Sequence, residues 1–394
     1  MSLLWSEKKR QNFWNDGSTH TGKKYRVDLE GREINMKKKA GILASVLLCV
    51  FFLGVSSIGF ANGKNELPNI KILATGGTIA GSADSNTKVT GYKAGAIGIE
   101  TLINAVPEMK KYANVSGEQV ASIGSNDMTN DVWLKLAARC NELLASDDVD
   151  GIVITHGTDT LEETAYFLNL VVKSDKPVVI VGAMRPATAI SADGPINLLN
   201  AVRVAGDKAS IGRGVLVVMN DEINGARDVT KTNTSTVSTF KAPELGCLGY
   251  IGAERPYFYK ESTRKHTKQT EFDVSGLTDL PNVEIIYTHV NEGRALVDAV
   301  IAEEAKGIVY AGSGMGSIHK NAEPALIEAQ KKGIVIVRSS RTGNGLVLPS
   351  SAQWTAEGFL DGDTLNPQKA RVLLQLALTK TDDPKEIQRM FNEY

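Results

Sequence analysis

Short apolar runs alternate with amphipathic stretches along most of the chain. The runs are rich in Val and Ile and apolar on both faces, which is typical of strands in a parallel sheet covered on both sides. The expected strands are Ile70–Ala74, Gly151–Thr155, Pro177–Gly182, Gly214–Met219, Val283–Tyr287, Gly307–Tyr310 and Gly333–Val337. The expected helices are Val132–Leu144, Leu161–Val172, Ile196–Val204, Ala295–Ala305 and Pro367–Leu378. This alternation predicts an α/β fold with helices on both faces of a parallel sheet.

The alternation fails between residues 254 and 282, where the chain is charged, aromatic and rich in turn residues. Such a stretch is typical of a linker between domains. The sequence therefore predicts a larger N-terminal α/β domain over residues 67–259, a linker over 260–281 and a smaller C-terminal α/β domain over 282–394.

The chain also carries a basic and then apolar segment near its N-terminus. Three lysines follow Met36, and residues 40–61 carry no charge. Gly59 and Ala61 stand at positions −3 and −1 of a small-residue cleavage site, so residues 36–61 predict a secretory signal peptide. A membrane anchor is the alternative, but it needs about 20 apolar residues, and two serines and a glycine interrupt this segment. We expect export to the periplasm, with membrane contact during export alone.

Residues 1–35 are polar and show neither a helical nor a strand period. Our hypothesis is that they are a leader outside the native protein, translated from upstream DNA, and that Met36 is the true start. The nucleotide sequence tests this, because a pyrimidine-rich stretch just before Met36 would exclude a ribosome-binding site there.

Composition excludes several classes of function. The 394 residues carry a formal net charge of −1, which gives no basic field for nucleic acid. Three cysteines exclude a disulfide-dense scaffold, although a disulfide between Cys140 and Cys247 is permitted outside the cytoplasm. The motifs H-E-x-x-H, C-x-x-C, G-x-x-x-x-G-K-[ST] and G-x-S-x-G are absent, so we expect no metal and no cofactor.

Candidate chemistry lies in loops that directly follow strands, where ligands of open α/β sheets bind. Thr78 follows two glycines that allow tight backbone geometry, although a simple turn would explain the same residues. Thr158 and Asp159 precede a helix N-terminus, which favours an anion or oxyanion. Thr160 and Glu163 fit a capping box.

Four further polar side chains have two interpretations each. A buried Lys231 could act on a hydroxyl, whereas an exposed one would be a surface charge. Ser125 and Asn126 suit a clamp on a carboxylate and an amine, and equally an ordinary turn. His156 could be a base, but a structural histidine is favoured. Hydroxyls, a carboxylate and a lysine together favour acyl transfer by an activated threonine.

Taken together, these loops match a known family. The segments Thr75–Gly81 and His156–Glu163 resemble the paired signature of the bacterial type II L-asparaginases, and the likeness extends from about Leu67 to Tyr394. It also includes Val181–Pro186, Ser191–Pro195, Asp228–Thr234 and Thr364–Arg371. The resemblance implies a flavodoxin-like N-terminal domain, a smaller C-terminal domain and hydrolysis of L-asparagine without a cofactor. It also implies a homotetramer, built as a dimer of intimate dimers, with active sites between subunits.

The resemblance assigns catalytic roles to five residues. Thr78 matches the nucleophile that forms the acyl-enzyme, and Tyr92, in the loop from Gly81 to Gly98, matches a tyrosine beside it. Thr158, Asp159 and Lys231 match a second cluster, in which the lysine lowers the cost of deprotonating Thr158 or the attacking water.

The resemblance also implies how a small amino-acid amide would be bound. Ser125 would hold the α-carboxylate, and Asp159 the α-ammonium with help from Asn126, which stands where the family often has glutamine. The carbonyl of Ala183 would receive the side-chain amide, and Asn291 would complete the site of a neighbouring subunit.

One departure leaves specificity open. Relatives often supply a glutamate to the neighbouring site, but the corresponding stretch Thr342–Asp363 holds only Glu357, which comes too late. A glutaminase-asparaginase acting also on L-glutamine is therefore an alternative. A non-catalytic periplasmic amino-acid-binding protein is a second alternative, although it would not need Thr78, Thr158 and Lys231 together.

Overall fold

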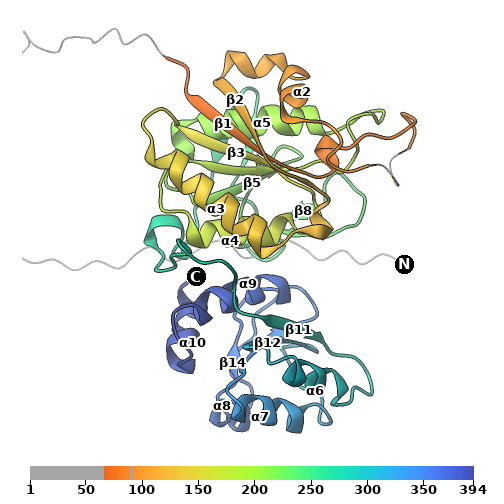
Figure 1. Cartoon of the computed structure of the whole chain (residues 1–394), viewed down its shortest axis with the longest axis vertical. Coiled ribbons are helices and arrows are strands. Elements are labelled where there is room, and N and C mark those ends of the chain that lie inside the picture. The colour runs from red at the N-terminus through yellow and green to blue at the C-terminus, as the bar shows by residue number, and fades with distance from the viewer. Residues whose placement is uncertain (1–65, 89–90, 92) are drawn as a thin grey trace, which may run out of the picture. The chain divides into compact units, whose positions relative to one another are not determined.

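The computed structural model describes residues 66–88, 91 and 93–394, and its compact part spans Glu66–Tyr394 (Figure 1). The leader, the signal peptide and Tyr92 lie outside the described residues. The described chain forms a larger N-terminal domain and a smaller C-terminal domain, each built around its own sheet. The domain boundaries given above remain predictions.

The N-terminal domain is built on an eight-stranded sheet with the order β10-β9-β6-β5-β4-β3-β1-β2. Its strands are β1 (Asn69–Gly76), β2 (Asn114–Ile123), β3 (Gly151–Thr155), β4 (Val178–Val181), β5 (Val215–Met219), β6 (Glu222–Gly225), β9 (Gly249–Gly252) and β10 (Arg255–Phe258). The order β2-β1-β3-β4-β5 is parallel and flavodoxin-like, as predicted, and β6, β9 and β10 extend it in antiparallel fashion. A separate hairpin pairs β7 (Thr230–Lys231) with β8 (Phe240–Lys241).

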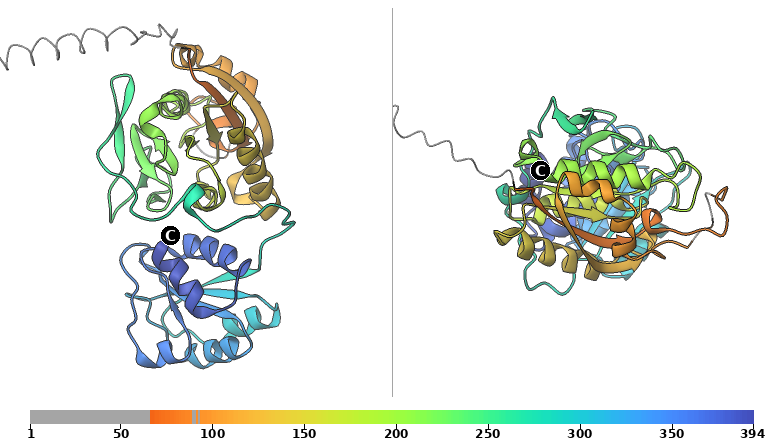
Figure 2. Two further views of the ribbon diagram at one scale, coloured as in Figure 1. Left: turned by 90° about the vertical axis from the view of Figure 1, so that its left-hand side faces the viewer. Right: turned by 90° about the horizontal axis from the view of Figure 1, so that it is seen from above.

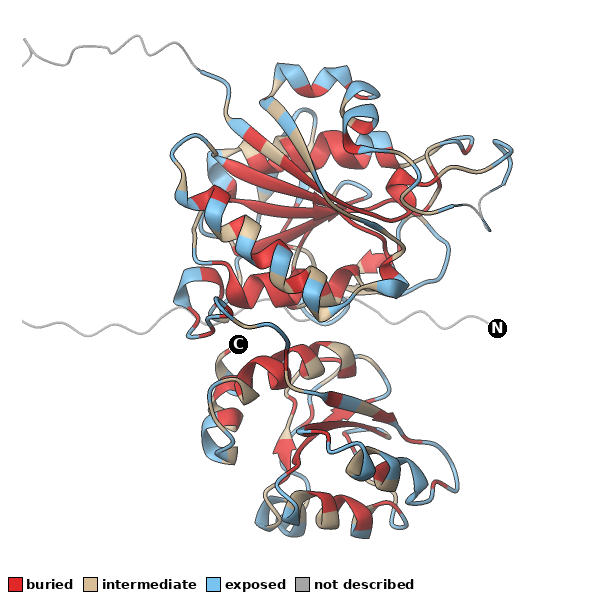
Figure 3. Ribbon diagram, in the orientation of Figure 1, coloured by how far each residue is buried: buried red, intermediate tan, exposed pale blue. Residues whose placement is uncertain are grey.

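Helices cover both faces of this sheet, which confirms the expectation from the apolar runs (Figures 1 and 2). The helices are α2 (Ile99–Asn104), α3 (Asn130–Ala145), α4 (Leu161–Val171) and α5 (Gly194–Gly206). Successive residues of one strand enter different cores: Ile152 and Ile154 pack with α3 and α4, whereas Val153 packs with α2 and α5. The central strands are accordingly buried along their length (Figure 3).

The C-terminal domain contains a four-stranded parallel sheet with the order β11-β12-β13-β14. Its elements are β11 (Val283–Tyr287), α6 (Ala295–Ala302), β12 (Gly307–Gly312), α7 (Glu323–Lys331), β13 (Val335–Ser340), α8 (Ala352–Ala356), β14 (Leu360–Asp361), α9 (Pro367–Leu378) and α10 (Pro384–Glu393). Residues of α9 and α10 share one buried cluster with α3 and α4, so an apolar core is continuous between the domains.

Several elements escape prediction for a physical reason. Strand β2 lies at the sheet edge and is only half-buried, so it has no apolar run. Strand β10 lies at the opposite edge and contains Pro256. An edge strand tolerates proline because it is hydrogen-bonded to a neighbouring strand on one side only. The stretch from residue 254, which shows no strand or helix pattern in the sequence, therefore begins with a strand.

The structure bears on the disulfide that the sequence permits and on membrane-spanning helices. Cys140 is buried and Cys247 half-buried, and both are free, so the permitted disulfide is not formed. Within Glu66–Tyr394, leaving aside residues 89–90 and 92, no helix is long and apolar enough to cross a membrane.

Candidate active site

Glycines bring two of the predicted loops into backbone contact. Gly76 and Gly77, where β1 ends, have φ angles of +111° and +79°, in the left-handed region that favours glycine. A Cβ atom on Gly77 would lie 2.3 Å from the Cα of Gly157. The loops after β1 and β3 therefore pack main chain against main chain, and Thr78 enters the same site as Thr158.

A cavity of about 610 Å³ opens where these strands end. Six side chains singled out from the sequence line it, namely Thr78, Ser125, Asn126, Thr158, Asp159 and Lys231. They come from the loops after β1, β2 and β3 and from the hairpin strand β7. The structure thus brings together residues that are more than 150 positions apart in the chain. This is the arrangement that the carboxyl ends of neighbouring parallel strands produce.

Lys231 contacts Thr158 and Asp159, in the loop between β3 and α4. Its Nζ donates to Thr158 Oγ1 at 2.9 Å and to Asp159 Oδ1 at 2.6 Å. The lysine side chain is 16% exposed, whereas that of Asp159 is 62% exposed, so water weakens this ion pair. The ion pair therefore orients the Lys231 side chain more than it stabilises the fold. It holds the cation against the Thr158 oxygen, where the cation favours loss of the hydroxyl proton.

Ser125 connects the loop after β2 to the same cluster. Its buried Oγ accepts a hydrogen bond from the Asp159 main-chain N–H at 3.0 Å, which leaves the hydroxyl proton for another acceptor. Its carbonyl oxygen accepts one from Thr160 Oγ1 at 2.8 Å. The predicted capping box is therefore wrong, because Thr160 precedes α4 without a side-chain cap and its hydroxyl holds the Ser125 loop instead.

The remaining predicted site residues take different positions. Thr78 is buried and opens a short 3-10 helix, Thr78–Ala80. Asn126 lines the cavity and donates from Nδ2 to Asp127 Oδ1 at 2.9 Å. Ala183 is buried directly before Met184, a lining residue. Asn291, in the loop after β11, does not line this cavity. It was expected to complete the site of a neighbouring subunit instead.

His156 is a buried structural residue, as favoured from the sequence. Its Nδ1 lies 2.7 Å from the carbonyl oxygen of Gly157 and its Nε2 lies 2.9 Å from Thr164 Oγ1. Burial lowers the pKa of His156 to about 4, so the ring is neutral at physiological pH. Because the side chain is fully enclosed, it cannot exchange protons with a ligand in the cavity.

Protonation of His156 predicts acid sensitivity of the fold. Its pKa in the folded chain lies below the ordinary 6.5, so the unfolded chain binds the proton first as pH falls. The stabilisation is complete above pH 6.5 and is lost as pH falls toward 4, by about 3 kcal/mol. Urea unfolding of His156→Gln between pH 4 and 7 should show a flatter pH slope than wild type, whereas exposed His289→Gln should not. Equal slopes in wild type and His156→Gln would contradict this.

Sequence reasoning missed several lining residues, among them Ala94, Met184, Arg185, Thr234 and Ser235. Arg185 and Met184 belong to the loop after β4, so its position after a predicted strand was a usable signal. Thr234 and Ser235 lie in the β7–β8 connection, whose folding over the cavity the sequence does not reveal. Among the residues that the structure describes, no group of three His, Cys, Asp or Glu could hold a metal ion.

Comparisons with known proteins agree with this architecture. The family described as "Asparaginase, N-terminal" matches residues 69–264, and "Glutaminase/Asparaginase C-terminal domain" matches residues 282–391. The chain is 62% identical to L-asparaginase 2 of Bacillus subtilis, covering 85% of this chain and 88% of the relative. It is 53% identical to a probable periplasmic L-asparaginase of Haemophilus influenzae, covering 89% and 99%.

A solved structure gives the same result for the fold. The crystal structure of a probable cytoplasmic L-asparaginase from Campylobacter jejuni superimposes with a TM-score of 0.81 at 53% identity, covering 83% of this chain and all of that one. Since the family matches span both domains and the relatives share more than half of their residues with it, this chain belongs to the asparaginase family.

Proposed function

We propose that the protein hydrolyses L-asparagine to L-aspartate and ammonia through an acyl-enzyme on Thr78. The observation that carries the proposal is the contact of Lys231 Nζ with Thr158 Oγ1, in the cavity that Thr78 also lines. A nucleophile and a cation-activated hydroxyl in one site are the groups that amide hydrolysis needs. The names of the relatives point to the same substrate.

The proposed reaction has two stages. Thr78 Oγ attacks the side-chain amide carbon, its proton passes to the departing nitrogen through the neighbouring hydroxyl groups, and the C–N bond breaks to release ammonia. Water then attacks the ester, the bond between the acyl carbon and Thr78 Oγ breaks, and aspartate leaves. In the second stage Thr158, held by Lys231, relays the proton: it receives one from the attacking water as its own hydroxyl proton passes on to the departing Thr78 Oγ, which is thereby restored.

Binding of the amino-acid end follows from the charges in the cavity. Ser125 retains a hydroxyl proton for the α-carboxylate, because its oxygen already accepts from the Asp159 main chain. The exposed Asp159 carboxylate lines the same cavity and suits the α-ammonium, with Asn126 as a second lining residue. We assign the carbonyl of Ala183, directly before a lining residue, to the side-chain amide.

A glutaminase-asparaginase of broad specificity is the second candidate. Glutamine differs from asparagine by one methylene, which changes discrimination by about 1–3 kcal/mol. The matched C-terminal family covers glutaminases as well as asparaginases. A non-catalytic amino-acid-binding protein is disfavoured, because binding alone does not require Lys231 to hold Thr158.

Ammonia release tests the proposal. Purified protein is incubated with L-asparagine and, in parallel, with L-glutamine. We expect rapid release from L-asparagine and at least tenfold slower release from L-glutamine. Comparable rates would favour the broad-specificity enzyme, and no release from either amide by folded protein would refute an amidohydrolase.

Assembly and location complete the proposal. We propose a periplasmic homotetramer, a dimer of intimate dimers, in which Asn291 of each subunit completes a neighbouring site, and we assign Tyr92 a catalytic role together with Thr78. One relative is named periplasmic and one solved relative is titled cytoplasmic, so the support for export is the segment 36–61. A secreted chain beginning at Asn62 would support export, and a fully active monomer would refute the shared site.

A further inference from the structure

A lysine of the C-terminal domain holds the chain just before Lys231. Lys369 lies in the first turn of α9, and its side chain is 2% exposed. Its Nζ donates to the carbonyl oxygen of Arg227 at 2.8 Å and to that of Val229. Those carbonyls belong to the segment that leads into β7, so Lys369 fixes the main chain one and three residues before Thr230–Lys231.

The start of α9 also holds the first turn of α4, the helix that follows Thr158 and Asp159. Glu162, in the first turn of α4, is buried with its Oε2 3.9 Å from Lys369 Nζ. That oxygen accepts a hydrogen bond from Asn366 Nδ2 at 3.0 Å, and Oε1 accepts one from Gln368 Nε2 at 3.1 Å. One segment, residues 366–369, therefore contacts both the first turn of α4 and the segment that leads to Lys231.

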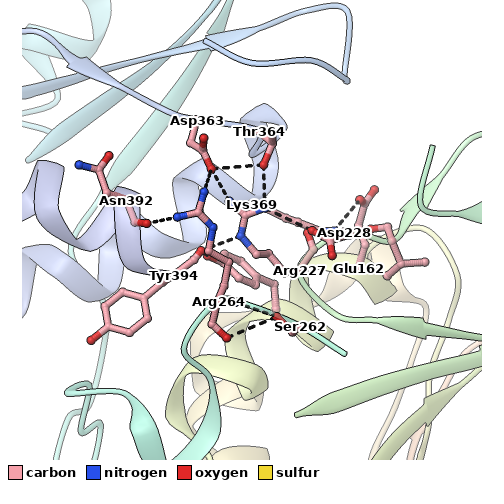
Figure 4. A network of polar contacts seen from close by, with 12 residues as sticks. Glu162, Arg227, Asp228, Ser262, Arg264, Asp363, Thr364, Lys369, Asn392 and Tyr394 are labelled. Carbon is pink, nitrogen blue, oxygen red and sulfur yellow. Dashed lines mark hydrogen bonds and ion pairs between the residues drawn. The ribbon is translucent and has the colours of Figure 1, made fainter. Parts of the chain in front are cut away.

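Figure 4 shows Glu162 and Lys369 beside a second group of contacts between the domains. There Arg227 donates to Asp363 Oδ2 at 2.8 Å and to Thr364 Oγ1 at 2.7 Å, and Arg264 also donates to Asp363 at 2.8 Å. Arg227 thus joins the two domains, and Arg264 joins the predicted linker to the C-terminal domain. Lys369 differs because its acceptors are main-chain carbonyls of the segment leading to Lys231.

The cost of burying this lysine argues for a specific role. Burial lowers the pKa of Lys369 to about 8, against attraction by Glu162. A buried ion pair contributes little to stability, and apolar residues of similar size often replace one without loss. An ammonium, however, can hold two carbonyls and a carboxylate at once, which an apolar side chain cannot do.

We infer that Lys369 is a positioning residue, which sets the distance between Lys231 and Thr158 from the other domain. The inference rests on the proposed function. Lys369 does not line the cavity, so it acts through Lys231 and not on the substrate. Its removal should disturb the reaction more than substrate binding.

A double-mutant cycle tests this role in the full-length protein. Lys369→Met should lower kcat for L-asparagine about 10- to 100-fold and change KM less than threefold. In a Lys231→Met background the same substitution should change kcat less than twofold, because residues that act as one unit are not additive. Equal effects in both backgrounds would overturn the inference.

Two further variants separate positioning from folding. Glu162→Gln/Lys369→Met removes both buried charges, so it should keep the fold and still show the low kcat. Arg264→Met removes a contact of the predicted linker with Asp363 but leaves both carbonyl acceptors of Lys369 in place, so it should keep kcat within twofold. A normal kcat in the folded double variant would overturn the inference, whereas absence of ammonia release by wild type would instead refute the proposed function.

Discussion

Replacement of Thr78 by alanine should reduce ammonia release from L-asparagine by about 10⁴-fold or more, the scale on which nucleophile removal acts in hydrolases. The substitution removes the hydroxyl and the γ-methyl group of a buried residue at the cavity wall. Because the groups assigned to the α-carboxylate and α-ammonium are on other loops, the variant should still bind L-aspartate. Steady-state ammonia release and calorimetric aspartate binding measure the two effects.

A matched threonine separates chemistry from folding. Thr101 is exposed on α2, away from the cavity, so Thr101→Ala should retain full turnover. Near-wild-type ammonia release by Thr78→Ala would refute Thr78 as the nucleophile. Loss of aspartate binding together with turnover would show that the hydroxyl mainly shapes the binding site.

Lys231→Met gives the second-largest expected effect. The variant keeps the length of the side chain but loses the donor that contacts Thr158 Oγ1 at 2.9 Å and Asp159 Oδ1 at 2.6 Å. Without the cation, the Thr158 hydroxyl gives up its proton less readily, and we expect kcat to fall about 10³-fold, within the range of acid–base contributions. Because Asp159 also loses its partner, KM should change as well, but less than kcat.

The control for Lys231 lies on the paired strand. Lys241, on β8, forms an ion pair with Glu222 and does not line the cavity, so Lys241→Met should leave kcat within about twofold of wild type. A loss of kcat shared equally by both variants would assign the effect to the hairpin. Unchanged kcat in Lys231→Met would remove the lysine from the mechanism.

The sequence could predict whatever depends on burial and on local motifs. Strands such as β3 are buried on both faces, so their apolar runs reveal them. Strand β2 is half-buried at an edge, and its polar residues conceal it. The two glycines before Thr78 were expected to allow tight backbone geometry, but the close approach of Gly77 to Gly157 depends on which strands are neighbours.

For the site, the sequence identified groups but not their pairing. Lys231 could have been a surface charge, and the fold buries it against Thr158. Thr160 fits a capping box by spacing, yet the loop after β2 lies close enough for Ser125 to take its hydrogen bond. Lys369 lies in the matched segment Thr364–Arg371, but the sequence did not indicate its role, because its contacts are to main-chain carbonyls more than 130 residues away.

Identification of the acyl-enzyme tests the central claim most directly. The protein is mixed with L-asparagine, quenched with acid within one turnover, digested and mapped by mass spectrometry. We predict an aspartyl ester on the peptide that contains Thr78, and its absence in Thr78→Ala. An ester on Thr158 instead, or ammonia released within that turnover without any ester, would contradict the account.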